Sequence, residues 1–207
     1  MTDIPKEAEK FLLPDKIKKQ LFYMFRDVIK LLNRAKVQWW AEGGTLLGAI
    51  RHKNIIPWDD DIDIGVLETE NLDIPKILNK LDSLLTFTPT FFGYKVFLKR
   101  GGKKLYTYGK EKDFTYPGLD IFVHIKKGNK IIYKEEKPRE YWKKYQWSPE
   151  ILFPLKKYQF GPLKINGANQ AEKYLDKGFG KNWRKKGKIY FNHSTERWLK
   201  NPIEFNL

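Results

Sequence analysis

Apolar residues near the N-terminus recur at helical spacing. Between Asp15 and Asn33 they fall three or four positions apart, and Pro14 followed by Asp15 is typical of a helix start. A helix with one apolar face packs against a core, so we expect it to support the fold rather than to carry chemistry. Its apolar positions are Ile17, Leu21, Phe22, Phe25, Val28, Ile29 and Leu32.

The pattern changes after this helix. Residues 37–42 are short, aromatic and β-prone, Gly43 and Gly44 follow, and residues 45–51 have helical character. The sequence therefore predicts a strand, a glycine turn and a short helix. Pro57 ends any helix before the acidic stretch that comes next.

The segment WDDDIDIGV, residues 58–66, alternates acidic and apolar positions. On a strand, residues two apart point to the same face. We therefore expect a strand on which Asp59, Asp61 and Asp63 share one face, while Asp60 points to the other face with the isoleucines.

The remaining pattern mixes helices and hairpins. We expect helices at 73–85 and 171–180, the second closed by Gly180. We expect strand pairs at 91–99 with 104–108, at 119–125 with 131–136, and on either side of Gly161-Pro162.

No repeat, linker or composition break divides the chain, and 207 residues with 41% apolar content suffice for one core. We expect a single domain over residues 1–207. In it, 1–36 form the N-terminal support, 37–125 the catalytic core, and 126–207 the C-terminal strands and helices on the acceptor side.

The net charge is +15, from 40 Lys and Arg against 25 Asp and Glu. This charge favours anionic partners such as nucleotides, phosphorylated glycans, lipid headgroups or nucleic acid, or it reflects an AT-rich genome. There is no cysteine, so disulfides and thiolate metal sites are excluded. Without a signal peptide or an apolar run of membrane-spanning length, we expect a soluble cytoplasmic protein.

Four aspartates within five positions repel one another, by roughly 1 to 4 kcal/mol per pair depending on the effective dielectric. A divalent cation removes this cost, and compact carboxylate clusters suit Mg²⁺ or Mn²⁺. Asp120 opens the apolar strand LDIFVHI, where an unpaired carboxylate is costly to bury. We expect it to join the cluster; capping a turn is the alternative. A solvated acidic turn or a Ca²⁺ loop is the alternative for the cluster as a whole.

The glycines that precede this acidic stretch suit a phosphate. Two residues without side chains at a helix start leave unpaired N–H groups in a concavity that an anion can enter. Arg51, between this cradle and the aspartates, can clamp a phosphate with two hydrogen bonds. His52 and Trp58 fit loop and packing roles better than catalytic ones, and for His124 both readings stay open.

The segments GGTLLGAIRHKNIIPWDDDIDIG, LDIF, FPLKKYQFG and YLDKGFG resemble the LicD/fukutin family. The resemblance implies an α+β (α/β) nucleotidyltransferase fold of the DNA polymerase β-like type, with a mixed β-sheet flanked by helices. It implies Mg²⁺-dependent transfer of a phospho-alcohol, such as phosphocholine or ribitol phosphate, from a CDP-linked donor to a glycan or glycolipid hydroxyl.

Position by position, the resemblance assigns roles to eight residues. It implies that Asp61 and Asp63 are the metal-binding pair, that Asp120 is the third acidic residue, and that Asp59 is the first acid of the cluster. The donor-binding positions are Gly43, Gly44, Thr45 and Arg51. The stretch GPLKINGANQ departs from the family pattern, which leaves the acceptor undefined.

Two other functions also fit the sequence. The same carboxylates could bind a nucleoside triphosphate and deliver the nucleoside monophosphate with release of pyrophosphate. A basic nucleic-acid-binding module without catalysis would bind any polyanion in a salt-sensitive way. The intact acidic cluster would repel nucleic acid, so we expect no stable nucleic-acid partner.

Overall fold

A computed structural model describes residues 4–107 and 109–207, so Tyr108, the predicted end of one strand, lies outside the described part. The centre is a six-stranded sheet in the order β1-β2-β7-β4-β3, with β8 paired to β7. β2 (Ile62–Leu67) runs parallel to β7 (Gly118–Lys127), and the other neighbours are antiparallel. The protein is thus of mixed α/β type with a mixed sheet.

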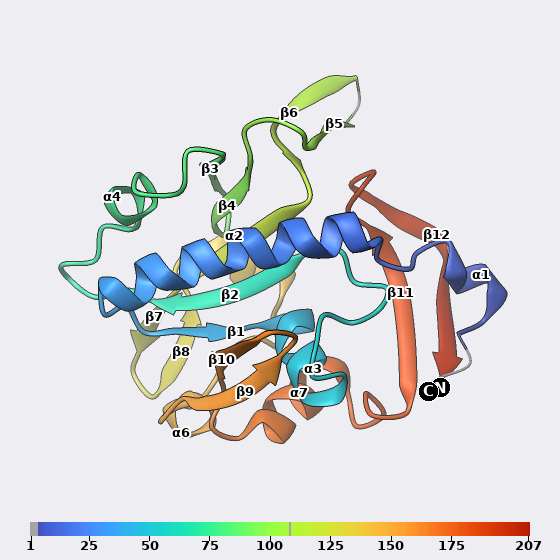
Figure 1. The fold of residues 1–207 in the computed structure, drawn as a ribbon. Coiled ribbons are helices and arrows are strands. Elements are labelled where there is room, and N and C mark those ends of the chain that lie inside the picture. Colours follow the sequence, from blue (N-terminus) through green and yellow to red (C-terminus); the bar gives the residue numbers. More distant parts are fainter. Residues whose placement is uncertain (1–3, 108) are drawn as a thin grey trace.

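The predicted support helix is confirmed as α2 (Asp15–Arg34), which follows α1 (Lys6–Glu9) and crosses one face of the sheet (Figure 1). Its apolar side is largely buried and joins the main hydrophobic cluster, with Ile17 partly buried at its N-terminal end. That burial, rather than helix propensity, holds the helix in place. The residues at 0% exposure are Leu21, Met24, Phe25, Val28 and Leu32.

The unit around the glycines differs from its prediction in two ways. β1 (Trp39–Ala41) leads into α3 (Gly43–Arg51), so both glycines form the first turn of the helix instead of a separate turn. β2 begins only at Ile62, and the acidic residues 59–61 form a loop in front of it. The reason is tertiary, because Asp60 and Asp61 bind a histidine from the far end of the chain.

The predicted helix over residues 73–85 was too long. α4 (Ile74–Leu78) ends early, since Asp82 forms a turn that accepts from the backbone N–H groups of Leu84 and Leu85. The chain then enters β3 (Leu85–Thr90). A helical periodicity over so few residues could not distinguish these two outcomes.

The predicted pairing of residues 91–99 with 104–108 was also wrong. β4 (Gly93–Leu98) lies between β3 and β7, and β5 (Lys103–Thr107) pairs instead with β6 (Lys110–Tyr116). Residues 95–98 are buried without interruption, which suits an inner strand of the sheet and not one half of a surface hairpin.

The C-terminal part follows its prediction as far as residue 180. β7 and β8 (Lys130–Tyr133) form one hairpin, β9 (Lys156–Phe160) and β10 (Leu163–Gly167) form another, and α7 (Ala171–Phe179) ends at Gly180 with φ +79°. The short helices between them are α5 (Glu136–Tyr141) and α6 (Pro149–Leu152).

A last hairpin, β11 (Lys186–Asn192) with β12 (Arg197–Asn206), was not predicted. It stands beside the loop that precedes β2 (Figure 1). In the described part of the chain, none of the helices combines the length and the apolarity that a bilayer crossing requires.

The close packing of β1 on β2 gives a test of the fold. A Cβ atom at Gly65 would lie 2.5 Å from the indole of Trp40, which is fully buried. We expect Gly65→Ala to lower the free energy of unfolding by about 1–3 kcal/mol, because overpacking forces side chains and backbone to shift. Denaturant titration measures the loss.

The two nearest atoms, Cε2 and Cζ2, belong to the larger indole ring system of Trp40, which a phenyl ring does not fill to the same extent, and Oε2 of Glu42 follows at 2.7 Å. Trp40→Phe should therefore cost less stability in the Gly65→Ala background than in the wild-type background. Equal costs in the two backgrounds would contradict this packing.

Candidate functional site

Three carboxylates meet at the start of the parallel pair β2 and β7. Asp63 of β2 and Asp120 of β7 are in register, and Asp61 directly precedes β2. Asp61, Asp63 and Asp120 each offer an oxygen within 4.8 Å of the others. The structure thus brings together the three aspartates that the sequence analysis placed in one cluster.

The first turn of α3 faces this cluster, and its glycines make the close approach possible. A Cβ at Gly43 would lie 3.1 Å from Oδ2 of Asp63, and one at Gly44 would lie 2.5 Å from Oδ2 of Asp59. Gly43 also has φ +51°, which favours glycine. The backbone N–H groups of the helix start therefore lie beside the carboxylates without side chains between them, and that of Gly43 donates to the hydroxyl of Tyr174 at 3.5 Å.

Thr45 fixes the helix to the strand. Its hydroxyl oxygen accepts a hydrogen bond of 2.8 Å from the backbone N–H of Asp63. The backbone N–H of Glu42 donates in turn to the carbonyl of Asp63, at 3.0 Å. These two contacts set the position of the Asp63 carboxylate relative to α3.

Two cations that the sequence analysis missed complete the cluster. Lys95 of β4 lies opposite Asp120, and its Nζ is 2.6 Å from Oδ1 of that carboxylate. His193, just after β11, has Nδ1 2.5 Å from Asp60 and Nε2 2.9 Å from Asp61. Neither residue belongs to a recognisable sequence motif. Lys95 reaches the cluster because β4 lies next to β7, and His193 reaches it because the last hairpin packs beside the acidic loop.

Burial and crowding shift the acidities in this cluster. Burial and the charge of Asp61 raise the pKa of both Asp59 and Asp63. Burial would also raise the pKa of Asp61, but His193 holds it below its usual value. Burial disfavours protonated His193, yet the charge of Asp61 and the hydrogen bonds to Asp60 and Asp61 raise its pKa well above the ordinary value. The partly exposed His193 is therefore favoured in its protonated, cationic form.

Lys95 and Asp120 behave as a buried ion pair. Burial opposes the charged form of Lys95, but Asp120 raises its pKa above the ordinary value. The pKa of Asp120 is also raised, first by burial and then by the charge of Asp61, although Lys95 opposes this. Lys95 thus offsets only part of the cost of burying the negative charge of Asp120.

Arg51 stands at the other end of α3 from the glycines, about 12 Å away along a helix that rises 1.5 Å per residue. Its guanidinium donates to the main-chain carbonyls of Trp183 and Lys186, and to the ring of His52. Burial lowers its pKa to about 10, and Asp59 counteracts that shift. These contacts tie α3 to the segment that leads into β11, and a direct role with phosphate stays a prediction.

His52 and Trp58 occupy packing positions. Trp58 is nearly buried against Phe205 and donates to the carbonyl of Lys188, while His52 packs edge-on against its ring. Burial and the neighbouring arginine lower the pKa of His52 to about 4.

His124 is fully buried on the far side of Glu42, with Nε2 3.4 Å from the Glu42 carboxylate. The hydroxyl of Tyr133 donates to the same carboxylate at 2.8 Å. The histidine thus belongs to a buried polar group behind α3 and not to the aspartate cluster.

The fold and the site together define a mixed α/β protein with an acidic centre beside the start of a helix. The chain belongs to the LicD/FKTN/FKRP nucleotidyltransferase-domain family, whose model matches residues 36–170. This membership confirms the resemblance found in the sequence.

The relatives differ in how far the similarity extends. An uncharacterized protein of Rickettsia prowazekii is 32% identical over 198 residues, which are 96% of this chain and 68% of that protein. Ribitol 5-phosphate transferase FKRP of Homo sapiens is 56% identical over 41 residues, 20% of this chain and 8% of its own. The lipopolysaccharide cholinephosphotransferase LicD of Haemophilus influenzae is 62% identical over 34 residues, 16% of this chain and 13% of its own.

These relatives are longer than the chain, and the two named ones match it only over a short, well-preserved stretch. Among solved structures, ANT(2″)-Ia in complex with adenylyl-2″-tobramycin has a TM-score of 0.44 at 11% identity, covering 79% of this chain and 78% of that one. A likeness at this level carries no functional argument.

The contacts of His193 yield a test of the site. Replacement by alanine removes two charge-assisted hydrogen bonds to Asp60 and Asp61, each worth about 1.5–3 kcal/mol. We expect His193→Ala to speed amide hydrogen exchange in β11 and β12 by tenfold or more, since the hairpin loses its anchor.

Ser194→Ala is the matched control, because that hydroxyl bonds only within the turn, to Asn192. Unchanged exchange in the His193→Ala hairpin would show that other contacts hold it.

Proposed function

We propose that this chain is a metal-dependent transferase that moves a phospho-alcohol from a CDP-linked donor to a hydroxyl of a glycan or glycolipid. The observation that carries the proposal is the acidic cluster at the side-chain-free start of α3. The names of the relatives support the reaction class, since they include a ribitol 5-phosphate transferase and a cholinephosphotransferase.

The residues at the cluster suit a divalent cation. Three carboxylate oxygens within 4.8 Å are the hard ligands that Mg²⁺ or Mn²⁺ prefers. The raised pKa of Asp63, caused by burial and its neighbouring aspartates, indicates negative charge that the chain leaves uncompensated. Asp61, Asp63 and Asp120 would hold the metal, which when bound neutralises phosphate charge as a Lewis acid.

The chain's own groups have separate tasks in this proposal. The N–H group of Gly44 donates to a phosphate oxygen of the donor, and that of Gly43 does so by exchanging its 3.5 Å hydrogen bond to the Tyr174 hydroxyl. The helix dipole favours negative charge there. Thr45 keeps the first turn of α3 in register with Asp63.

On the acceptor side, Asp59 or Asp120 accepts the proton of the attacking hydroxyl. Asp120 is already in an ion pair with Lys95, whereas Asp59 lies beside Gly44 at the start of α3. We therefore favour Asp59 as the proton acceptor. Arg51 orders the segment that leads into β11 by donating to its main-chain carbonyls.

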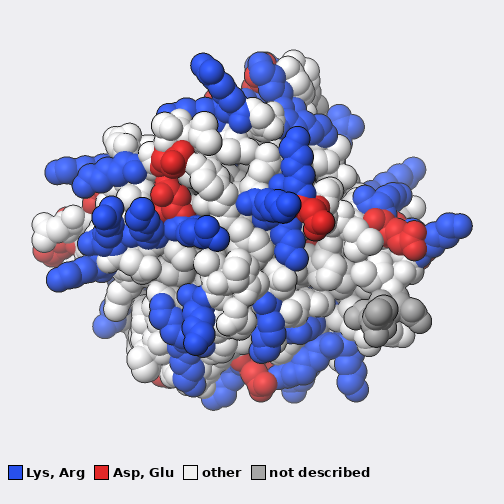
Figure 2. Space-filling view, viewed as in Figure 1, with Lys and Arg blue, Asp and Glu red and all other residues white. Residues whose placement is uncertain are grey.

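A nucleic-acid-binding role has less support. Figure 2 shows Lys and Arg side chains spread over the whole visible face, with no continuous basic stripe that would follow a nucleic-acid backbone. The carboxylates of the acidic centre would also repel a nucleic-acid backbone.

Asp61→Asn tests the metal site. A ligand that binds only the folded state raises its stability, by about 2.7 kcal/mol when its concentration is 100 times the Kd. We expect Mg²⁺ or Mn²⁺ with CDP to raise the melting temperature of the wild type but not of Asp61→Asn, and turnover to be lost.

Asp113→Asn on β6 is the control, because it removes an exposed carboxylate away from the cluster. A full metal-dependent shift in Asp61→Asn would refute this assignment of ligands.

The products decide between the two transferase reactions. Phospho-alcohol transfer from a CDP-linked donor releases CMP, whereas nucleotidyl transfer from a triphosphate releases pyrophosphate. We expect CMP to accumulate in step with modified acceptor when the wild type is incubated with CDP-ribitol or CDP-choline. Pyrophosphate release from CTP at a comparable rate would favour nucleotidyl transfer instead.

A further inference from the structure

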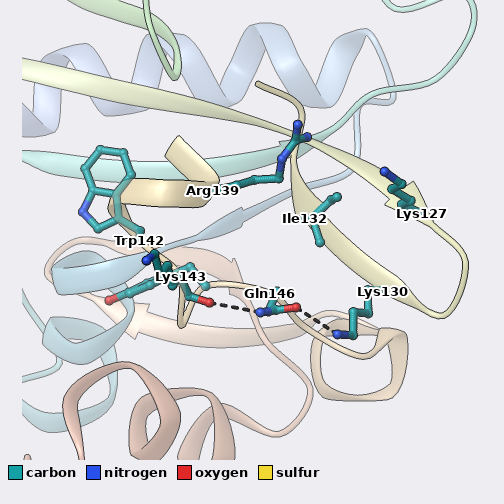
Figure 3. Close-up of a pocket in the computed structure, with 8 residues that line it drawn as sticks. Lys127, Lys130, Ile132, Arg139, Trp142, Lys143 and Gln146 are labelled. Carbon is teal, nitrogen blue, oxygen red and sulfur yellow. Dashed lines mark hydrogen bonds between the residues drawn. The ribbon is translucent and has the colours of Figure 1, made fainter. Parts of the chain in front are cut away.

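A cavity of about 260 Å³ opens between the end of the β7–β8 hairpin, α5 and the segment that follows α5 (Figure 3). It is separate from the acidic cluster, and none of the proposed site residues lines it. The lining residues are Lys127, Lys130, Ile132, Arg139, Trp142, Lys143, Tyr145 and Gln146.

Half of this lining is cationic, and no acidic residue belongs to it. Two of the cations are held in place. Arg139 donates to the main-chain carbonyls of Tyr133 and Lys134, at 3.0 and 2.8 Å, and Lys130 donates to the side chain of Gln146 at 3.0 Å. In the described part of the chain, none of the four lining cations forms an ion pair with a carboxylate.

Within the described residues, the lining cations are not paired with carboxylates, although Glu136 and Glu140 lie on α5 beside them. Lys177, whose ammonium lies over the ring of Trp147, has its pKa lowered first by burial and then by the charge of Lys130. Cations that repel one another at fixed positions gain free energy when an anion enters between them. The cavity therefore has the charge of an oxyanion site.

Exposed aromatic rings adjoin the same cations. Trp142, which lines the cavity, stacks nearly parallel on Phe91 with ring centroids 5.8 Å apart. Phe91 is 42% exposed and Tyr141 is 64% exposed, and their rings lie 6.2 Å apart. Lys137 stands over Phe91 at 5.1 Å. Large exposed rings are costly in water, so this patch is suited to contact with a partner.

We propose that this basic-aromatic face, formed by the four lining cations with Phe91, Tyr141 and Trp142, docks on an anionic lipid bilayer. A phospholipid phosphate enters the cavity between Arg139 and the lysines, and the rings enter the headgroup region, where amphipathic aromatic side chains concentrate. Lysines beside such rings keep their ammonium groups in water while attracting anionic lipid.

A bilayer fits these features better than nucleic acid. Phe91 carries no hydrogen-bonding group, and one face of its ring is already stacked on Trp142. The cations surround one small cavity instead of following a groove. The docking does not depend on the proposed transfer reaction, and it is tested without donor or metal.

Vesicle sedimentation tests the charge. We expect the full chain to sediment with vesicles of phosphatidylcholine containing one third phosphatidylglycerol, and not with phosphatidylcholine alone. Lys127→Gln with Lys143→Gln should weaken this binding about 25-fold, from about fivefold for each charge near the surface. Lys16→Gln with Lys19→Gln, on exposed positions of α2, removes the same net charge and should change binding less than threefold.

The aromatic part has its own variant. Tyr141→Ser should weaken vesicle binding several-fold, whereas Tyr106→Ser, at an exposed tyrosine of β5, should leave it unchanged. Circular dichroism and thermal melting show that each variant is folded.

Three outcomes would overturn the proposal. They are no binding to the anionic vesicles, equal losses in the two lysine pairs, or binding that a single-stranded oligonucleotide abolishes while Tyr141→Ser has no effect. The second would indicate diffuse electrostatic attraction, and the third a nucleic-acid surface.

Discussion

Several carboxylates are held together out of water at the start of β2 and β7, and the surrounding structure compensates for their repulsion. In a parallel pair, register alone places Asp63 beside Asp120. Like charges at such separations are tolerated only if other groups offset them. Lys95 from β4, His193 from the last hairpin and the start of α3 all converge on this point, each from a different element.

The sequence predicted the acidic partners but not the basic ones, for a physical reason. A carboxylate at the start of an apolar strand is costly to bury alone, so Asp120 could be assigned to the cluster from its local surroundings. Lys95 offers no comparable signal, since a lysine between apolar residues is typical of any strand edge. Its role depends on β4 lying next to β7, and that order is set by the whole sheet.

The errors within elements have the same origin. Period-two alternation through residues 59–63 predicted a strand. Residues 59–61 instead form a loop, because Asp60 and Asp61 contact a histidine about 130 positions away in the chain. The helix over 73–85 failed where one aspartate turns the chain toward β3. By contrast, α2, the β7–β8 hairpin and α7 formed as predicted, because their patterns depend on neighbours in sequence.

The bridge made by His193 links the last hairpin to the acidic centre thermodynamically. The family model ends at residue 170, whereas the imidazole that holds Asp60 and Asp61 comes from beyond it. Any ligand that alters the interaction between Asp61 and His193 changes the hairpin's docking equilibrium, and docking changes the ligand's affinity by the same factor. Docking of the C-terminal hairpin and binding of a ligand at the acidic cluster are thus thermodynamically coupled. A contact that stabilises or loosens the hairpin changes the affinity of the cluster for its ligand.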